Sequence, residues 1–433
     1  MDRLRLRRQT GVTLIELMVA MVLGLLVVAG IATVFTSTSH SHRVQTQLAR
    51  LQEEGRFAIA RISADLRMAN GQYCASTGDV AQPGADGTIS LDGLRAPKVH
   101  ARNLTAAMSD VTTMMGTHPY PAPAASYTFP SFLSMRGYDC GKTSPCTPAN
   151  PPAGLPAMGT WVGKRVVGAS VITVRYVDGS RGWAIGNNST MTTDTDGTVA
   201  SITLAPGTGE PPIEDFAAGD LAMLADCSNA QIFAVNGGGT ATLSPKSSDN
   251  YDKPLAYKQQ SAPRLFDFNS DFLTVTYYLK VISTNDDGQP PLTGALMRRV
   301  NGGPDEELLR GIERLNFRYG VEDANGHTRY LTAAQVDAST SVDCPPSAPT
   351  PLGTDPGCLW RAVKTIEVSI LMSGQEPLHT LNAAERGYTY AVDGITTPQP
   401  PSAHAIKPSD QGFADAMIRR EFTALISVRN YNP

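Results

Sequence analysis

Glu16 is the residue whose type and position most clearly call for chemistry. From Val12 to Phe35 the chain is almost wholly apolar, and Glu16 is its only ionisable side chain. A run of about 20 apolar residues in a helix crosses the hydrocarbon core of a bilayer. A carboxylate inside such a helix costs roughly 2.5 to 3.5 kcal/mol on insertion scales, so it is expected to have a partner or a function.

The segment before this run is short and basic, and its arginines are Arg3, Arg5, Arg7 and Arg8. Basic residues flanking a membrane span remain in the cytoplasm, which leaves everything after Phe35 outside. We therefore expect a single-pass protein of a Gram-negative inner membrane with its head in the periplasm.

Two ordinary membrane segments are weaker explanations of this N-terminus. A secretory signal peptide has an apolar region of about 7 to 15 residues and ends in a small-x-small cleavage site. Here the apolar run is longer and continues into Thr36 and Ser37 without such a site. A plain membrane anchor leaves Glu16 unexplained.

The sequence Gly11-Val12-Thr13-Leu14-Ile15-Glu16-Leu17 resembles the class III prepilin signal. In that signal a basic leader ends in Gly, and T-L-I-E-L and an apolar helix follow one residue later. The resemblance implies that prepilin peptidase cuts between Gly11 and Val12 on the cytoplasmic side and methylates the new amine of Val12. Val12 stands where Phe is more usual.

Cleavage at that bond would give Glu16 its role. It generates a cation on Val12 at the membrane edge, and Glu16 of one subunit can neutralise the corresponding cation of its neighbour. A buried charge without its mate is strongly unfavourable, so such a pair favours correct register during assembly.

The elements that must position this site begin with one long helix. Apolar or small residues at spacings of three and four continue beyond the membrane, at Val44, Leu48, Leu51, Gly55, Ile59, Ile62, Leu66 and Ala69. We predict a helix from Val12 to about Ala69, roughly 85 Å long at 1.5 Å per residue. Residues 12–35 would lie in lipid or the filament core, and residues 36–70 would pack on a head.

Most charged residues of the second half are expected to lie off the apolar face. They are Arg50, Glu53, Glu54, Arg61 and Asp65. Gly24, Gly30 and Gly55 weaken the helix locally. His40 and His42 are interpreted as solvated.

After Ala69 the hydrophobic pattern changes to a period of two, typical of strands. The expected strands are 171–176, 201–204, 221–224, 232–235, 273–279, 315–319, 363–372 and 423–428. The fold class is therefore α+β and type IV pilin-like, with leader 1–11 and a β-rich head over 71–433. Residues 76–160 are rich in Pro, Gly and Ser and look like an insertion that could hold a subdomain, and 338–358 and 394–410 look like shorter surface loops.

Motifs along nearly the whole chain resemble the PilW-type minor pilins, relatives of the J-type minor pseudopilins of type II secretion. They are Gly55-Arg56-Phe57-Ala58, Asp65-Leu66-Arg67-Met68-Ala69, Val171-Ile172-Thr173-Val174-Arg175-Tyr176, Gly219-Asp220-Leu221 with Asp226-Cys227, Tyr277-Tyr278-Leu279, Glu307-Leu308-Leu309-Arg310-Gly311-Ile312-Glu313, Phe317-Arg318-Tyr319-Gly320, Arg419-Arg420-Glu421-Phe422 and Val428-Arg429-Asn430. The resemblance implies a subunit that primes assembly of a type IV pilus with other minor pilins and the major pilin on an inner-membrane platform. It also implies a place near the pilus tip.

Six cysteines fit disulfides better than a metal site. They are Cys74, Cys140, Cys146, Cys227, Cys344 and Cys358. None forms a C-x-x-C pair, and no His stands at zinc-ligand spacing from them. Disulfides persist in the periplasm. Cys140 with Cys146 and Cys344 with Cys358 would close short loops, which leaves Cys74 for Cys227, although the sequence does not choose among the possible pairings.

The remaining patterns give no support for an enzyme, a cofactor or a metal. Catalytic signatures such as G-x-S-x-G, H-E-x-x-H and a Walker loop are absent from the sequence. Gly237–Gly239, Asp194–Gly197 and Thr284–Gly288 are interpreted as turns rather than phosphate or calcium loops. With 36 basic and 40 acidic side chains, the net charge of −4 gives no broad attraction to nucleic acid.

Three functions therefore stay open, with the minor pilin preferred. A pseudopilin of type II secretion would have the same N-terminal chemistry. A binding module for a host surface or a tip adhesin could lie in the 76–160 insertion, through its aromatic residues Tyr120, Tyr127, Phe129, Phe132 and Tyr138. Aromatic residues among prolines are just as readily a small packed loop, and a binding module would be an addition to the pilin role.

Overall fold

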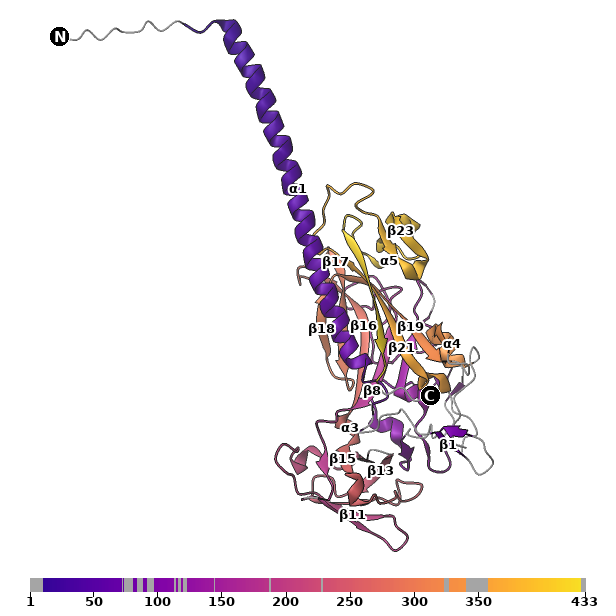
Figure 1. Ribbon diagram of the computed structural model, residues 1–433. Helices are drawn as coiled ribbons and strands as arrows, with labels where there is room; N and C mark the ends of the chain where they lie inside the picture. The colour runs from indigo at the N-terminus through magenta and orange to yellow at the C-terminus, as the bar shows by residue number, and fades with distance from the viewer. Residues whose placement is uncertain are drawn as a thin grey trace, which may run out of the picture. The chain divides into compact units, whose positions relative to one another are not determined.

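One long helix and several mainly antiparallel sheets make up the structure, a computed structural model. It describes residues 11–71, 73, 81–83, 89–91, 97–112, 114–115, 118–119, 123–143, 145–186, 188–226, 229–322, 327–339 and 357–429. The chain forms two compact units, residues 1–52 and residues 53–433. The described part of the first unit is the N-terminal stretch of helix α1 (Leu14–Leu66), and the second unit holds the rest of α1 and all the strands (Figure 1).

Helix α1 begins and ends close to the bounds that the hydrophobic periodicity predicts. Within the second unit its buried face includes Ala58, Ile62 and Leu66, each 0% exposed. The helix ends because Asn70 takes a positive φ of 60°, which Asn tolerates better than most residues. The N–H of Asn70 then donates to the carbonyl of Arg175 at 3.1 Å, joining the helix end to the head.

Two sheets form the part of the head that carries the helix. The first has five strands in the order β18 (Asp305–Arg310), β17 (Leu292–Val300), β16 (Phe272–Ser283), β8 (Val171–Val177) and β7 (Met135–Tyr138). The second has four strands in the order β20 (Thr328–Leu331), β19 (Ile312–Glu322), β21 (Val363–Ser373) and β24 (Arg419–Ser427). All neighbours in both sheets pair antiparallel.

A third sheet forms a second lobe of the head, with α3 leading from it into β16 (Figure 1). Its nine strands are β10 (Thr190–Thr193), β11 (Val199–Thr203), β14 (Thr242–Pro245), β13 (Ala230–Asn236), β12 (Leu221–Ala225), β15 (Arg264–Asp267) and β9 (Trp183–Ala184), with β3 (Lys98–Val99) beside β13 and β6 (Tyr127–Thr128) beside β3. Trp183, Phe216 and Phe233 are fully buried in its own hydrophobic core.

Shorter elements complete the described part of the chain. Three two-stranded sheets are β1 (Ala81–Pro83) with β2 (Ile89–Leu91), β4 (Met114–Met115) with β5 (His118–Pro119), and β22 (Tyr388–Tyr390) with β23 (Ile395–Gln399). The short helices are α2 (Ser131–Ser134), α3 (Phe268–Asp271), α4 (Ala333–Ala338) and α5 (Pro408–Gln411). Single turns of 3-10 helix are η1 (Leu104–Ala107), η2 (Ile213–Asp215), η3 (Gln259–Ser261), η4 (Cys358–Trp360), η5 (Ala391–Asp393) and η6 (Pro401–Ala403).

The strands predicted from period-two alternation all overlap observed strands, and the α+β class is confirmed. The predicted turns at 194–197, 237–239 and 284–288 lie between paired strands. The described parts of 76–160 contribute strands to two of the larger sheets. They give β3 and β6 to the second lobe and β7 to the five-stranded sheet.

Buried carboxylates mark the junction between the second lobe and the five-stranded sheet. Asp267, the last residue of β15, caps α3 by accepting hydrogen bonds from the Asn269 N–H at 2.9 Å and the Ser270 hydroxyl at 2.6 Å. It is 2% exposed. Burial raises the pKa of Asp267 to about 6, and the nearby charges of Asp220 and Asp271 add to the increase against these hydrogen bonds.

Asp267→Asn is expected to raise the free energy of unfolding at pH 8 by about 1–3 kcal/mol. An acid whose pKa is raised by folding destabilises the fold above its folded-state pKa. This penalty disappears as the pH falls below the unfolded value of about 4. Urea unfolding of the full-length protein in detergent, followed by tryptophan fluorescence at pH 8 and pH 4, measures the effect.

Glu214→Gln is the matched control, because Glu214 is an exposed carboxylate of the same lobe. An equal gain from both variants would attribute the effect to net charge rather than to burial of Asp267.

Candidate assembly site

The N-terminus of α1 is closed by a reciprocal cap between Thr13 and Glu16. The Thr13 N–H and hydroxyl donate to Oε2 of Glu16 at 3.0 and 2.9 Å, and the Glu16 N–H donates to Oγ1 of Thr13 at 3.3 Å. This is the S/T-x-x-E capping box, which satisfies two N–H groups that a helix start leaves without partners. It explains why the helix begins at Leu14 rather than at Val12.

Glu16 has hydrogen bonds but no cation. Among the described residues no Lys, Arg or His side chain forms an ion pair with it, and its hydrogen-bond partner in the first unit is Thr13. Its negative charge therefore stays on the surface of an apolar helix. The basic leader, residues 1–10, lies outside the described residues.

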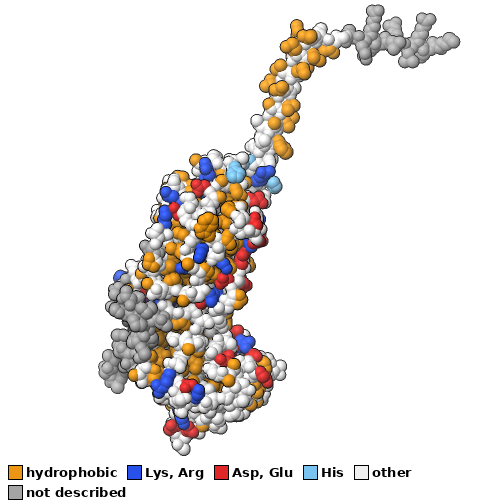
Figure 2. Space-filling view, turned by 180° about the vertical axis from the view of Figure 1, so that it is seen from behind, with side chains coloured by type: hydrophobic (Ala, Val, Ile, Leu, Met, Phe, Trp, Pro, Cys, Tyr) orange, Lys and Arg blue, Asp and Glu red, His pale blue; other side chains and the backbone are white. Residues whose placement is uncertain are grey.

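The helix around Glu16 presents apolar side chains on every side. Figure 2 shows hydrophobic side chains covering the N-terminal stretch of α1, and Val12, Leu14 and Ile15 are 72%, 76% and 72% exposed. Among the described residues α1 is the one helix long and apolar enough to cross a membrane. A polar head with such a helix needs either lipid or other helices to cover it.

A second carboxylate of the same helix has the opposite environment. Asp65 is 8% exposed and accepts hydrogen bonds from the hydroxyls of Tyr176 at 2.7 Å and Tyr277 at 2.5 Å. Nε of Arg298 donates to Oδ2 of Asp65 at 2.7 Å. These partners come from β8, β16 and β17, so the cluster fastens the helix to three adjacent strands.

Electrostatics favour the charged form of Asp65. Burial raises the pKa of Asp65, but hydrogen bonds from Arg298, Tyr277 and Tyr176 outweigh it, and the pKa is lowered overall. The prediction that Asp65 lies off the apolar face is wrong. Its position three residues after Ile62 in the apolar repeat was the available signal, because it places Asp65 on the buried stripe.

Comparison with known proteins identifies both ends of the chain. Residues 276–430 match the family model of the Type IV Pilus-assembly protein W, and residues 6–32 match the Prokaryotic N-terminal methylation motif. A search of curated proteins gave no significant match. A type IV-like pilin from Thermus thermophilus can be aligned with 50% of this chain and 86% of its own chain, at 13% sequence identity. The TM-score of 0.19 is too low to support an inference from this alignment.

The two family matches support a PilW-type minor pilin. The matched residues include the capped segment around Glu16 in one region and Tyr277, Arg298 and β24 in the other. Both carboxylate sites therefore involve parts of the chain that the family models recognise. The family supports a structural rather than a catalytic role.

The cysteines of the minor pilin agree with the disulfide prediction where the structure describes them. Cys140 and Cys146 are joined. Cys358 is also disulfide-bonded, while its predicted partner Cys344 lies outside the described residues. The predicted pair Cys74 with Cys227 lies outside them too.

The aromatic residues proposed as a binding surface are instead part of the core. Tyr127, Phe129, Phe132 and Tyr138 are between 1% and 5% exposed. Phe129 packs edge-on against Phe272. The prediction that these four contact a partner is wrong, because a partner cannot reach them, and Tyr120 lies outside the described residues.

Asp65→Asn is expected to destabilise the head by roughly 3 kcal/mol, because it leaves the Arg298 charge without its buried partner. The lowered pKa of Asp65 means that the parent's advantage is present above pH 4 and is lost as the pH falls through the folded-state value. Thermal unfolding of the full-length protein in detergent at pH 7 and pH 3 measures both effects.

Glu53→Gln serves as the control for the Asp65 variant, because Glu53 is an exposed carboxylate of the same helix. Equal stability of the parent and Asp65→Asn at pH 7 would mean that the four-residue cluster does not hold the helix.

Proposed function

We propose that this minor pilin is a structural subunit that primes assembly of a type IV pilus and then occupies a position near its tip. The observation that carries the proposal is Glu16, a capped but uncompensated carboxylate on an exposed apolar helix. A protein that only needed an anchor would avoid the cost of that charge.

The proposed path begins in the inner membrane. Residues 1–11 serve as the leader, residues 12–35 cross the bilayer, residues 36–70 continue the helix, and the head over 71–433 is in the periplasm. Prepilin peptidase cuts between Gly11 and Val12 and methylates the amine of Val12. The match of residues 6–32 to the methylation motif supports this assignment.

Capping of Glu16 by Thr13 suits a subunit that waits in lipid. The two hydrogen bonds to Oε2 lower the cost of placing a carboxylate there but leave its charge in place. Cleavage before Val12 creates an amine one residue from the cap. The methylated amine of the neighbouring subunit then supplies the cation that Glu16 lacks, so leaving lipid for the filament becomes favourable.

The proposed partners follow from this path. They are prepilin peptidase, the other minor pilins, the major pilin, the assembly platform of the inner membrane and, at the tip, an adhesin. The family model, described as a pilus-assembly protein, favours a pilus over the pseudopilus of type II secretion.

Glu16→Ala is expected to leave leader removal intact but to lower the number of surface pili. The variant keeps its cleavage site and apolar span, but it cannot neutralise a neighbour's amine. Mass spectrometry of the mature N-terminus checks the processing, and quantitation of sheared pili checks the assembly. Glu53→Ala, which removes an exposed carboxylate of the same helix beyond the apolar span, should leave both unchanged.

Normal piliation with Glu16→Ala, or a mature protein that still carries its arginine leader, would contradict this role for the carboxylate.

Deletion of the gene is expected to abolish twitching motility while protein secretion by the type II system continues. The reason is that a priming subunit acts on one filament only. Motility on agar and enzyme activity in the culture supernatant measure the two functions. Loss of secretion with intact motility would identify the chain as a pseudopilin instead.

A further inference from the structure

Helix α1 and the terminal strand β24 approach each other in the second unit, and the residues just after each of them are also in contact. At one end a Cβ on Gly55 would stand only 2.5 Å from the ring of Phe422, so glycine is what allows this close approach. At the other end the Arg429 N–H donates to the carbonyl of Arg67 at 3.0 Å. These contacts bound the space between helix and strand.

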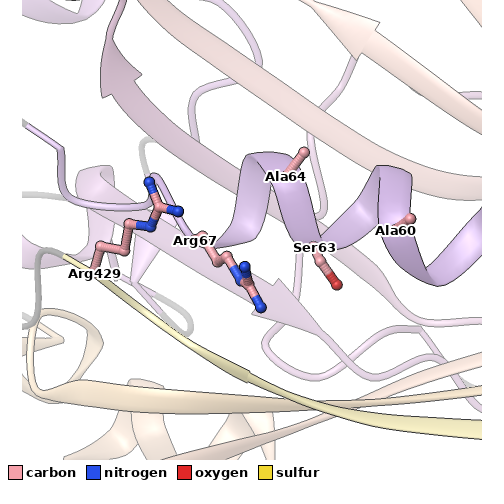
Figure 3. A pocket seen from close by; sticks show the side chains of 5 residues that line it. All are labelled: Ala60, Ser63, Ala64, Arg67 and Arg429. Atoms are coloured by element: carbon pink, nitrogen blue, oxygen red, sulfur yellow. The ribbon is translucent and has the colours of Figure 1, made fainter.

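A slot opens along the helix beside the contact between Arg429 and Arg67, and its lining comes from α1 and from the residues just after α1 and β24. The cavity of about 550 Å³ is lined by Ala60, Ser63, Ala64, Arg67 and Arg429. Figure 3 shows Arg67 and Arg429 beside each other at one end of the row of small residues on α1. The small side chains at Ala60, Ser63 and Ala64 keep the helix flank clear.

The outer edge of β24 carries backbone N–H and C=O groups that no other described strand pairs with. β24 ends its sheet and pairs with β21 alone. The Val428 N–H points to β21, where it donates to Lys364, and the Arg429 N–H points away from it toward α1. Because backbone groups alternate along an antiparallel strand, those of Thr423, Leu425 and Ser427 face the same way as Arg429.

The outward groups of Thr423, Leu425 and Ser427 have no backbone hydrogen bond within the described part of the chain. Such a free edge is a template for another strand, and proteins cover or block it. The edge also carries an exposed apolar side chain, because Leu425 is 57% exposed.

The charge at the slot is positive and uncompensated. Neither Arg67 nor Arg429 forms an ion pair with any residue that the structure describes, and both are exposed. Other arginines of the head have carboxylate partners, as Arg314 has Asp393 and Arg419 has Glu313. Two exposed arginines without a carboxylate partner among the described residues favour a carboxylate ligand.

We propose that the slot between α1 and β24 receives an extended, carboxylate-bearing segment of an adjacent pilin subunit. The backbone of that segment pairs with the edge at Thr423–Ser427, and its carboxylate binds Arg67 and Arg429. The proposal rests on the pilin role, because a filament is what sets another subunit against α1. A lipid phosphate would satisfy the two arginines but would leave the strand edge open.

The test uses the full-length protein in living cells with a photo-crosslinking residue in the slot. Ser63→p-benzoyl-phenylalanine is expected to capture another pilin, with the linked peptide containing Asp or Glu. Arg56→p-benzoyl-phenylalanine is the matched control, because Arg56 is exposed on the same helix but does not line the slot. Crosslinks are identified by mass spectrometry in both the membrane fraction and the sheared pili.

Charge reversal tests the two arginines. Arg67→Glu combined with Arg429→Glu is expected to reduce the Ser63 crosslink tenfold or more, whereas Arg67→Lys with Arg429→Lys retains it. The amount of protein in the membrane fraction reports whether each variant folds. If the reversed variant is absent from that fraction, the same comparison with Arg67→Gln and Arg429→Gln decides.

Capture of phospholipid, or no capture above the Arg56 control, overturns the inference, as does an undiminished crosslink in the charge-reversed variant. Failure of the pilin role gives a different pattern, in which the wild-type protein never reaches sheared pili and Glu16→Ala changes nothing. Because crosslinking is also measured in the membrane fraction, the proposed slot is tested even if the protein does not reach the pili.

Discussion

A carboxylate needs a cation when it is taken out of water, and the two central acids of this helix meet that requirement in different ways. Asp65 has Arg298 and two tyrosine hydroxyls from its own head, so its charge is balanced inside one subunit. Among the described residues Glu16 has only the Thr13 cap, which supplies hydrogen bonds without positive charge. One acid therefore stabilises the fold, and the other is the one for which we propose a partner on another chain.

The two acids have different surroundings because they lie at different positions on the helix. Asp65 lies on the stripe that includes Ile62 and Leu66, so strands surround it when the head folds. Apart from Thr13, the side chains around Glu16 are apolar and exposed, and no element of the described chain covers it. A buried pair with both partners in place is tolerated, whereas a lone charge in hydrocarbon is costly enough to drive association.

Local sequence patterns predict the helix and many of the strands. They do not predict which strands that are distant in the sequence pair with one another. The apolar span, the helix through Leu66 and the strands with clear alternation are properties of short windows. β17 was missed because Gly294 and the pair Arg298 and Arg299 interrupt its apolar pattern. The sequence does not predict that the second lobe has a hydrophobic core of its own. Its sheet includes β3, which pairs with β13 although the two strands are far apart in the sequence. The capping box is also a local pattern, because Thr13 and Glu16 stand three residues apart at the start of an apolar helix.

The free edge of β24 resembles Glu16 in lacking a partner within the described part of the chain, since the edge lacks a strand and Glu16 lacks a cation. Each sheet of a soluble head is expected to protect its terminal strands, yet β24 presents outward backbone groups beside two arginines that have no carboxylate among the described residues. Gly55 and the hydrogen bond from Arg429 to Arg67 hold the helix against the strand at both ends, so the space between them is built into the fold. An unsatisfied charge on the helix and an unsatisfied edge on the neighbouring strand are both understandable if the stable form of this protein is a polymer rather than a single chain.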